Sequence, residues 1–138
     1  MHRHPDWDTR LAAYLESIRL RAFEWGGHDC CLFAAGAVLA MTGDDPMAEF
    51  RGRYSTALGA ARALTRIGAG SLAATMDAKF ERVGPLLAHR GDIVMTSGLL
   101  AICLGLHLVA VGAEGEHEGL IRLDRDPALE TAAWRVPY

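Results

Sequence analysis

Residues 25–36 read Trp25-Gly-Gly-His-Asp-Cys-Cys-Leu-Phe-Ala-Ala-Gly36, a polar, glycine-marked turn that opens into an apolar segment. Asp29 suits an N-cap, and the uncharged run from Cys30 to Met41 is typical of a helix buried on all sides. The pattern therefore predicts a central helix that ends at Thr42-Gly43. Cys30 then lies in its first turn, where backbone N–H groups and the helix dipole favour a thiolate.

Helical spacing of apolar residues predicts further helices on either side of this segment. The first is capped by Asp6 or Asp8 and runs to about Ala22. After a short helical or irregular connection over residues 47–54, Ser55 caps a helix that closes at Gly68, and Ser71 caps a short one to about Ala78.

The pattern changes after Phe80 to short apolar runs separated by glycines. These runs predict strands, at residues 92–95, 99–104, 107–111 and 120–123. Helices followed by strands indicate the α+β class, with the N-terminal helices packed on a small antiparallel sheet. We expect a single domain over residues 1–138.

The bulk composition excludes several classes of protein. A net charge of −3 and a pI near 6.0 do not favour binding to nucleic acid or to an anionic membrane. Three cysteines, two of them adjacent, make a disulfide framework unlikely to form and favour a reducing compartment. The N-terminal segment has no apolar signal core, and the longest apolar run suits a buried helix, so we predict neither Sec-type export nor membrane insertion.

Cys30 is the candidate nucleophile, the alternative being a small buried residue beside the cap. A thiol nucleophile needs a base within about 2.6–3.2 Å. His28 is the nearest candidate base in the sequence, although it cannot easily point back at the sulfur. His89 and His107 are expected at the far end of the strands, and three more histidines fall in terminal or loop segments: His2, His4 and His117.

No cofactor is predicted, and no metal site either. Zinc would have to use the three cysteines and His28, which lack ligand spacing such as Cys-x-x-Cys. Asp92 is expected to bind backbone N–H groups of the preceding turn.

Four further residues are candidates for contact with a ligand or partner. Arg51, Arg53 and Tyr54 suit a carboxylate or phosphate, the alternative being ion pairs with Asp44, Asp45 or Glu49. Trp134 is either a core or rim anchor of the last strand or an interface residue.

Three motifs together resemble the NlpC-type branch of the papain-like cysteine peptidases. They are Trp25-Gly26-Gly27 with Asp29-Cys30, then Gly91-Asp92-Ile93-Val94-Met95, then Leu100-Ala101-Ile102-Cys103-Leu104-Gly105. The resemblance spans roughly residues 23–112 and implies a papain-like fold with Cys30 at the nucleophile position. It also places the catalytic histidine at Leu99 and the polar residue that orients it near Val111. Both partners of the cysteine are thus replaced by aliphatic residues.

A second resemblance covers nearly the whole chain. The sequence is similar to small uncharacterised proteins encoded in the tail modules of tailed phages, prophages and gene-transfer-agent-like elements. The shared elements are the first helix, Phe23-x-Trp25-Gly26 with Asp29-Cys30, Arg51-Gly52-Arg53-Tyr54, Arg90-Gly91-Asp92, the strand from Leu99 to Gly105, and Ala133-Trp134-Arg135-Val136.

This second resemblance implies a structural or assembly component of a tail tip with a degenerate peptidase scaffold. The protein would be made in the bacterial cytoplasm and then carried in the virion tail, with tail-hub or tail-tip proteins as partners. The alternative is an active cysteine peptidase or amidase that cleaves peptidoglycan peptides, with Cys30 as nucleophile and His28 or another group as base. A third possibility, acyl transfer or acyl binding, needs only the thiolate.

Overall fold

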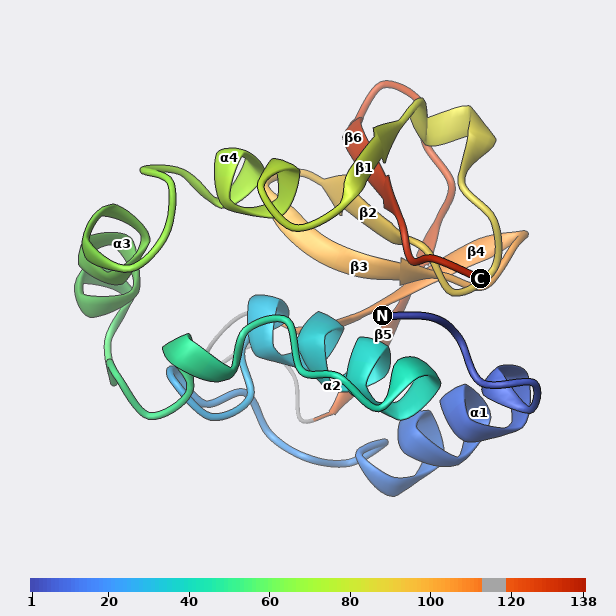
Figure 1. The fold of residues 1–138 in the computed structure, drawn as a ribbon, viewed down its shortest axis with the longest axis horizontal. Coiled ribbons are helices and arrows are strands. Elements are labelled where there is room, and N and C mark those ends of the chain that lie inside the picture. Colours follow the sequence, from blue (N-terminus) through green and yellow to red (C-terminus); the bar gives the residue numbers. More distant parts are fainter. Residues whose placement is uncertain (113–118) are drawn as a thin grey trace.

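A computed structural model describes residues 1–112 and 119–138 as an α+β structure in which helices precede strands (Figure 1). The α+β class expected from the sequence is therefore confirmed. The helical elements are α1 (Trp7–Ser17), α2 (Cys30–Thr42), η1 (Ala48–Phe50), α3 (Ala57–Arg66), α4 (Leu72–Asp77) and η2 (Pro85–Leu87). The strands are β1 (Glu81–Val83), β2 (Ile93–Thr96), β3 (Leu99–Cys103), β4 (His107–Val111), β5 (Leu120–Asp124) and β6 (Glu130–Arg135).

The strands form one antiparallel sheet in the order β1-β6-β2-β3-β4-β5. Consecutive strands from β2 to β5 are neighbours, whereas β6 returns from the C-terminus to lie between β1 and β2. Trp134 on β6 is thereby placed opposite Ile93 on one side and Arg82 on the other. The C-terminal strand is consequently an interior strand of the sheet, paired on both sides.

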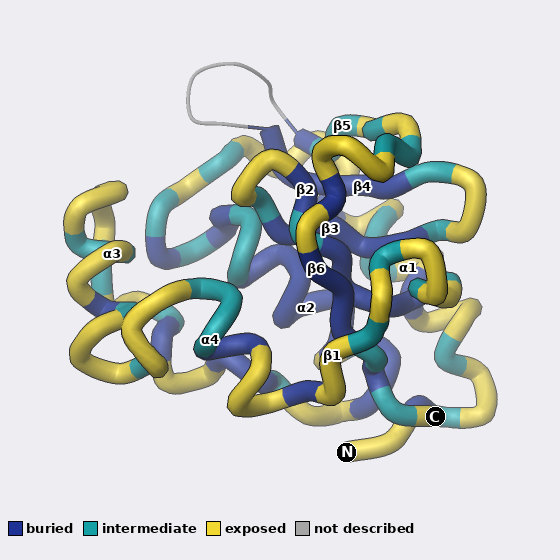
Figure 2. The backbone as a smooth tube through the Cα atoms, turned by 90° about the horizontal axis from the view of Figure 1, so that it is seen from above, coloured by how far each residue is buried: buried dark blue, intermediate teal, exposed yellow. Residues whose placement is uncertain are grey.

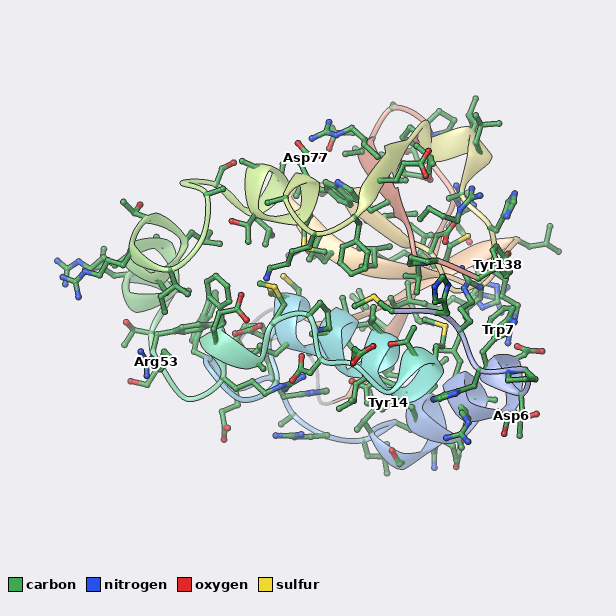
Figure 3. The ribbon with its side chains drawn as sticks, viewed as in Figure 1. Asp6, Trp7, Tyr14, Arg53, Asp77 and Tyr138 are labelled. Carbon is green, nitrogen blue, oxygen red and sulfur yellow. The ribbon has the colours of Figure 1, made fainter. Side chains whose placement is uncertain are left out.

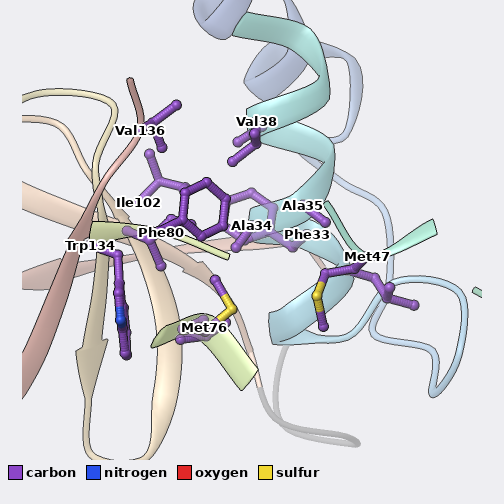
Figure 4. Close-up of a cluster of buried hydrophobic side chains, with 14 of the residues drawn as sticks. Phe33, Ala34, Ala35, Val38, Met47, Met76, Phe80, Ile102, Trp134 and Val136 are labelled. Carbon is purple, nitrogen blue, oxygen red and sulfur yellow. The ribbon is translucent and has the colours of Figure 1, made fainter. Parts of the chain in front are cut away.

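Helix α2 packs on one face of this sheet and forms the main core with it. Phe33 and Val38 of α2 lie near Ile102 of β3, and Trp134 of β6 lies beside Phe80 and Met76 in the same cluster (Figure 4). Alternate residues of the strands point to the other face, where a smaller buried cluster forms: Val94, Ala101, Cys103, Leu108, Ala110 and Ala133. Because α1 covers the side of α2 away from the sheet, most of the central helix is buried, as its composition predicts (Figure 1). Leu39, which is 42% exposed, is the exception to the all-round burial expected from the sequence.

The predicted boundaries of α2 are correct, whereas α1 is shorter than predicted. The Asp29 side chain caps α2 by accepting a hydrogen bond from Leu32 N, and Gly43 ends it with φ +84°. Helix α1 ends at Ser17 rather than near Ala22. The chain beyond Ser17 is held by the sheet instead, since Leu120 N donates to Arg19 O at 3.0 Å.

Helix α3 lies at the edge of the molecule, away from the sheet, and most of its backbone is exposed (Figures 1 and 2). Its cap is Thr56 rather than Ser55, through a hydrogen bond from Gly59 N. Ala63 is the buried residue of this helix. In the part of the chain that the structure describes, no helix is both long and apolar enough to cross a membrane.

Candidate functional site

The turn before α2 is held in place by the buried carboxylate of Asp29. Asp29 Oδ1 accepts from Leu32 N at 2.9 Å, while Oδ2 accepts from Gly26 N at 3.1 Å and from the Tyr54 hydroxyl at 2.5 Å. Gly26 has φ +78°, and a Cβ there would overlap the backbone carbonyl of Tyr54. One carboxylate therefore joins the turn, the first turn of α2 and the segment around Tyr54.

The segment from Arg51 to Tyr54 packs directly against this turn. Gly52 N donates to Gly26 O at 2.9 Å, which pairs the two backbones. Burial and the hydrogen bond to Asp29 raise the pKa of Tyr54, so its hydroxyl stays a donor. Two motifs that are distant in the sequence thus form a single wall.

Behind this wall lies a cavity of about 250 Å³ at the start of α2. Cys30 and Cys31 line it from the helix, and Leu99 lines it from the start of β3. The remaining lining comes from the turn, η1, α3, α4 and the β2–β3 turn: Trp25, Asp29, Phe50, Tyr54, Ala57, Ala60, Ala61, Leu64, Leu72 and Gly98. Most of these side chains are apolar, and the described lining contains no histidine.

Burial governs the ionisation of Cys30, contrary to the expectation from its place at the helix terminus. It raises the pKa of the Cys30 thiol, and the charge of Asp29 adds to the rise. The backbone N–H groups of Leu100 and Cys31 act in the opposite direction but are outweighed. A helix N-terminus stabilises a nearby thiolate by about 0.3–1 kcal/mol, which lowers the thiol pKa by less than about one unit. Loss of hydration can raise the same pKa by several units. The prediction of a favoured thiolate is therefore wrong. Burial raises the pKa of Cys31 further still.

His28 does not face the cavity that holds Cys30. It lines a separate cavity of about 280 Å³ between α1 and α2, with Tyr14, Leu32 and Arg51 among its neighbours. The imidazole is 2% exposed and packs edge-on against Phe33, and among the described residues its Nε2 has no hydrogen-bond partner. Burial lowers the pKa of His28 to about 4, so it is neutral at pH 7. It is placed as a core residue and not as a base for Cys30.

Leu99 occupies the position where the resemblance to the peptidases requires a histidine. It lines the cavity beside Cys30 but has no group that accepts a proton. Continuing the register of β3 and β4, in which Ile102 pairs with Val109, places Val111 opposite Leu100 at the same end of the sheet. Val111 and Leu100 are buried aliphatic residues, and Leu99 is a partly exposed one. The sheet thus presents a hydrophobic surface to the thiol.

The other histidines that the structure describes lie away from Cys30. His107 begins β4 at the far end of β3, where its carbonyl accepts from Leu104 N. His89 is at the same end, because its N–H donates to Asp92 Oδ2. His2 contacts Tyr138 and His4 lies near Gly43, while His117 lies outside the described residues.

Arg51 and Trp134 are satisfied within the chain. Arg51 Nε donates to Asp45 Oδ2 at 2.6 Å, which is the intramolecular alternative considered above. The side chain of Trp134 is 0% exposed, and its Nε1 donates to Asp77 Oδ1 at 2.9 Å. Trp134 is a core anchor and has no surface for a partner, since β6 lies inside the sheet.

Asp92 is a structural residue with more partners than predicted. Besides the expected turn N–H of His89, its carboxylate accepts from Arg3 Nη2, Arg135 Nε and Val136 N at 2.8–3.0 Å. Asp92 is 0% exposed, so these bonds join the two chain ends to β2. Nothing local to Asp92 in the sequence indicates that Arg3 and Arg135 pair with it.

Sequence reasoning also missed Arg62 and Arg66, which with Arg53 line a hollow on the outer side of α3. The available signal was the absence of any acidic residue between Glu49 and Asp77. Among the described residues, no group of three or more His, Cys, Asp or Glu side chains is placed to hold a metal ion.

Comparison with curated proteins gives no match. The family described as domain of unknown function DUF6950, in contrast, matches residues 2–136, which is nearly the whole chain. The chain therefore belongs to the DUF6950 family.

Proposed function

We propose that this chain is a non-catalytic papain-like domain that serves as a structural or assembly component of a phage or prophage-like tail tip. The observation that carries the non-catalytic part is the cavity at Cys30. The partly buried Cys30, whose thiol has a raised pKa, shares this cavity with Leu99, and the described lining offers no imidazole. The tail-tip part is supported by the sequence resemblance to tail-module proteins.

The arrangement of elements supports the papain-like scaffold. Cys30 begins the buried central helix, and the start of β3 lines the same cavity, as the alignment with NlpC-type peptidases expects for the cysteine and histidine positions. On this alignment, Leu99 takes the place of the imidazole that would meet the thiol. A scaffold that keeps this geometry but replaces the base by a leucine is the expected outcome when the chemistry is no longer needed.

Three features oppose nucleophilic attack by Cys30. Its thiol carries a raised pKa, so the thiolate is scarce at neutral pH. Among the described residues, the one carboxylate in the lining is that of Asp29, which already accepts three hydrogen bonds. His28, which would be the nearest base in the sequence, lines a different cavity. Without a proton acceptor, the cysteine loses the activation that a base supplies.

The alternative is a cysteine peptidase or amidase acting on peptidoglycan peptides, which is favoured only by the open cavity at Cys30. Release of muropeptides from purified sacculi by the wild-type chain and by Cys30→Ser separates the two. We expect no release by either protein. Release by the wild type that is lost in Cys30→Ser would overturn the non-catalytic assignment.

The assembly role is tested on particles. We expect the protein to co-purify with tails at constant stoichiometry, and tails made without it to lose infectivity or tip structure. The Cys30→Ser protein is expected to restore both. Fully infectious particles with intact tips in the absence of the protein would overturn the proposal.

A further inference from the structure

The outer side of α3 borders a hollow of about 470 Å³ that is separate from the cavity at Cys30. Its charged lining consists of three arginines, Arg53, Arg62 and Arg66, beside the hydroxyl groups of Ser55 and Thr56. The opposite side of α3 lines the Cys30 cavity with alanines and Leu64. Helix α3 thus has one apolar side turned inward and one basic side turned to solvent.

These three arginines are not neutralised by any carboxylate in the part of the chain that the structure describes. Of the thirteen arginines, eight form ion pairs with carboxylates, but none of the three does so with any described residue. Residues 50–76 contain four arginines and no Asp or Glu. A chain with a net charge of −3 therefore carries a positive patch at this edge of the molecule that no described carboxylate compensates.

The geometry of the patch matches a surface with spaced negative charges. Arg62 and Arg66 are one helical turn apart on the same side of α3, so their attachment points are about 5–6 Å apart. Arg53 approaches from the segment before the helix, and Figure 3 shows it beside α3 at the edge of the molecule. Leu58, one turn before Arg62, is 60% exposed, and Ile67 at the rim is 36% exposed. Guanidinium groups and aliphatic side chains therefore share this surface.

We infer that this surface, defined by Arg53, Arg62, Arg66 and Leu58, binds an acidic segment of a partner protein. The complementary segment carries carboxylates about one helical turn apart and an aliphatic side chain that covers Leu58. Arginine forms paired hydrogen bonds with a carboxylate and is enriched at protein interfaces. The inference stands apart from the tail-tip proposal, because it needs only the purified chain to be tested.

A nucleic acid fits the same surface less well. The positive charge is confined to one hollow and does not form a track along the molecule, and the acidic remainder of the chain would repel a phosphate backbone. Binding of single strands also uses exposed aromatic faces for stacking. The aromatic residue here is Tyr54, which is half-buried and hydrogen-bonded to Asp29.

The test is a titration followed by fluorescence anisotropy with a labelled peptide of glutamate pairs and leucines. Peptides with glutamine in place of glutamate, and a single-stranded DNA oligomer of equal charge, are measured beside it. Each of Arg53→Gln, Arg62→Gln and Arg66→Gln is expected to weaken binding of the glutamate peptide about two- to fivefold, and the triple variant at least about tenfold. The matched control is Arg21→Gln with Arg122→Gln, since these exposed arginines also lack an ion pair with any described residue but lie outside the hollow.

Three results would overturn the inference. They are no binding of the glutamate peptide at an ionic strength of about 0.01 M, an equal loss in the control variant, and tighter binding of the DNA oligomer. Replacing the three arginines with glutamate provides a second measurement, which detects a gain of binding and not only a loss. That variant, with unchanged circular dichroism, is expected to bind a lysine version of the peptide and no longer the glutamate version.

Discussion

Replacing Leu99 with histidine places an imidazole in the cavity that holds Cys30. In the wild-type protein burial raises the pKa of Cys30 above the ordinary value of 9.0, so less than about 1% of it is thiolate at pH 7. Transfer of the thiol proton to this imidazole would give a thiolate–imidazolium pair, in which the two charges attract strongly because the cavity is largely apolar and screens charge poorly. Leu99→His should therefore make Cys30 more reactive.

The size of the effect follows from the cavity. Two opposite charges about 4 Å apart attract by roughly 4 kcal/mol at an effective dielectric constant of about 20, which lowers a thiol pKa by up to about 3. Each unit increases the thiolate at pH 7 about tenfold, while the weaker nucleophilicity of a more acidic thiol removes a factor of roughly three. The net gain in alkylation rate is thus about threefold per unit, or about 30-fold for the full effect.

The assay is alkylation by iodoacetamide between pH 6 and pH 9, with peptide fragmentation to separate Cys30 from Cys31 and Cys103. We expect slow labelling of wild-type Cys30 at pH 7 and a clear increase in Leu99→His. Leu99→Gln is the matched control, since it adds a polar group of similar size without a titratable proton. Cys30 in this control variant should be alkylated at the wild-type rate.

Two results would refute the reasoning. Fast labelling of wild-type Cys30 at pH 6 would mean that the helix terminus, and not burial, governs its pKa. An unchanged rate in a folded Leu99→His protein would mean that position 99 does not approach the thiol. The second result would also remove the main support for the papain-like arrangement.

Three further predictions concern the scaffold. Asp92→Asn should lower the free energy of unfolding by about 3–5 kcal/mol in urea titrations, because Arg3 is left buried without its counter-charge, and a loss below about 1 kcal/mol would contradict this. The folded chain holds the pKa of His28 at about 4 against 6.5 when exposed, so the unfolded chain binds more protons between these values. The contribution of His28 to the free energy of unfolding is therefore fully present above pH 6.5 and falls by up to about 3 kcal/mol as the pH drops to 4. His28→Phe should abolish this part of the acid sensitivity. Gly26→Ala should destabilise the fold by more than about 2 kcal/mol, since its Cβ would overlap a backbone carbonyl, whereas Gly52→Ala, at a similar φ with open space around it, should cost only about 1 kcal/mol.

Local signals in the sequence were sufficient for the central helix. The Asp29 cap, the apolar run and Gly43 act within a few residues of one another, so the boundaries of α2 could be predicted correctly. The strands β2, β3 and β4 were located for the same reason, by short apolar runs between glycines. Strand β1, with only three residues and mostly exposed side chains, has no such pattern.

The candidate site was only partly predictable, because its parts come from distant segments. The grouping of Asp29 with Tyr54 depends on how residues 50–54 fold back onto the turn. The placement of His28 in a different cavity from Cys30 depends on the packing of α1 against α2. No spacing in the sequence encodes either arrangement.

By itself, the sequence determined that a cysteine starts a buried helix and that helices precede an antiparallel sheet. Only the tertiary structure decided that β6 inserts between β1 and β2, where Trp134 is buried, and that burial raises the pKa of Cys30. The reason is physical. Caps, turns and apolar periodicity act over a few residues, whereas strand order and the hydration of a thiol depend on segments that meet only after the chain has folded.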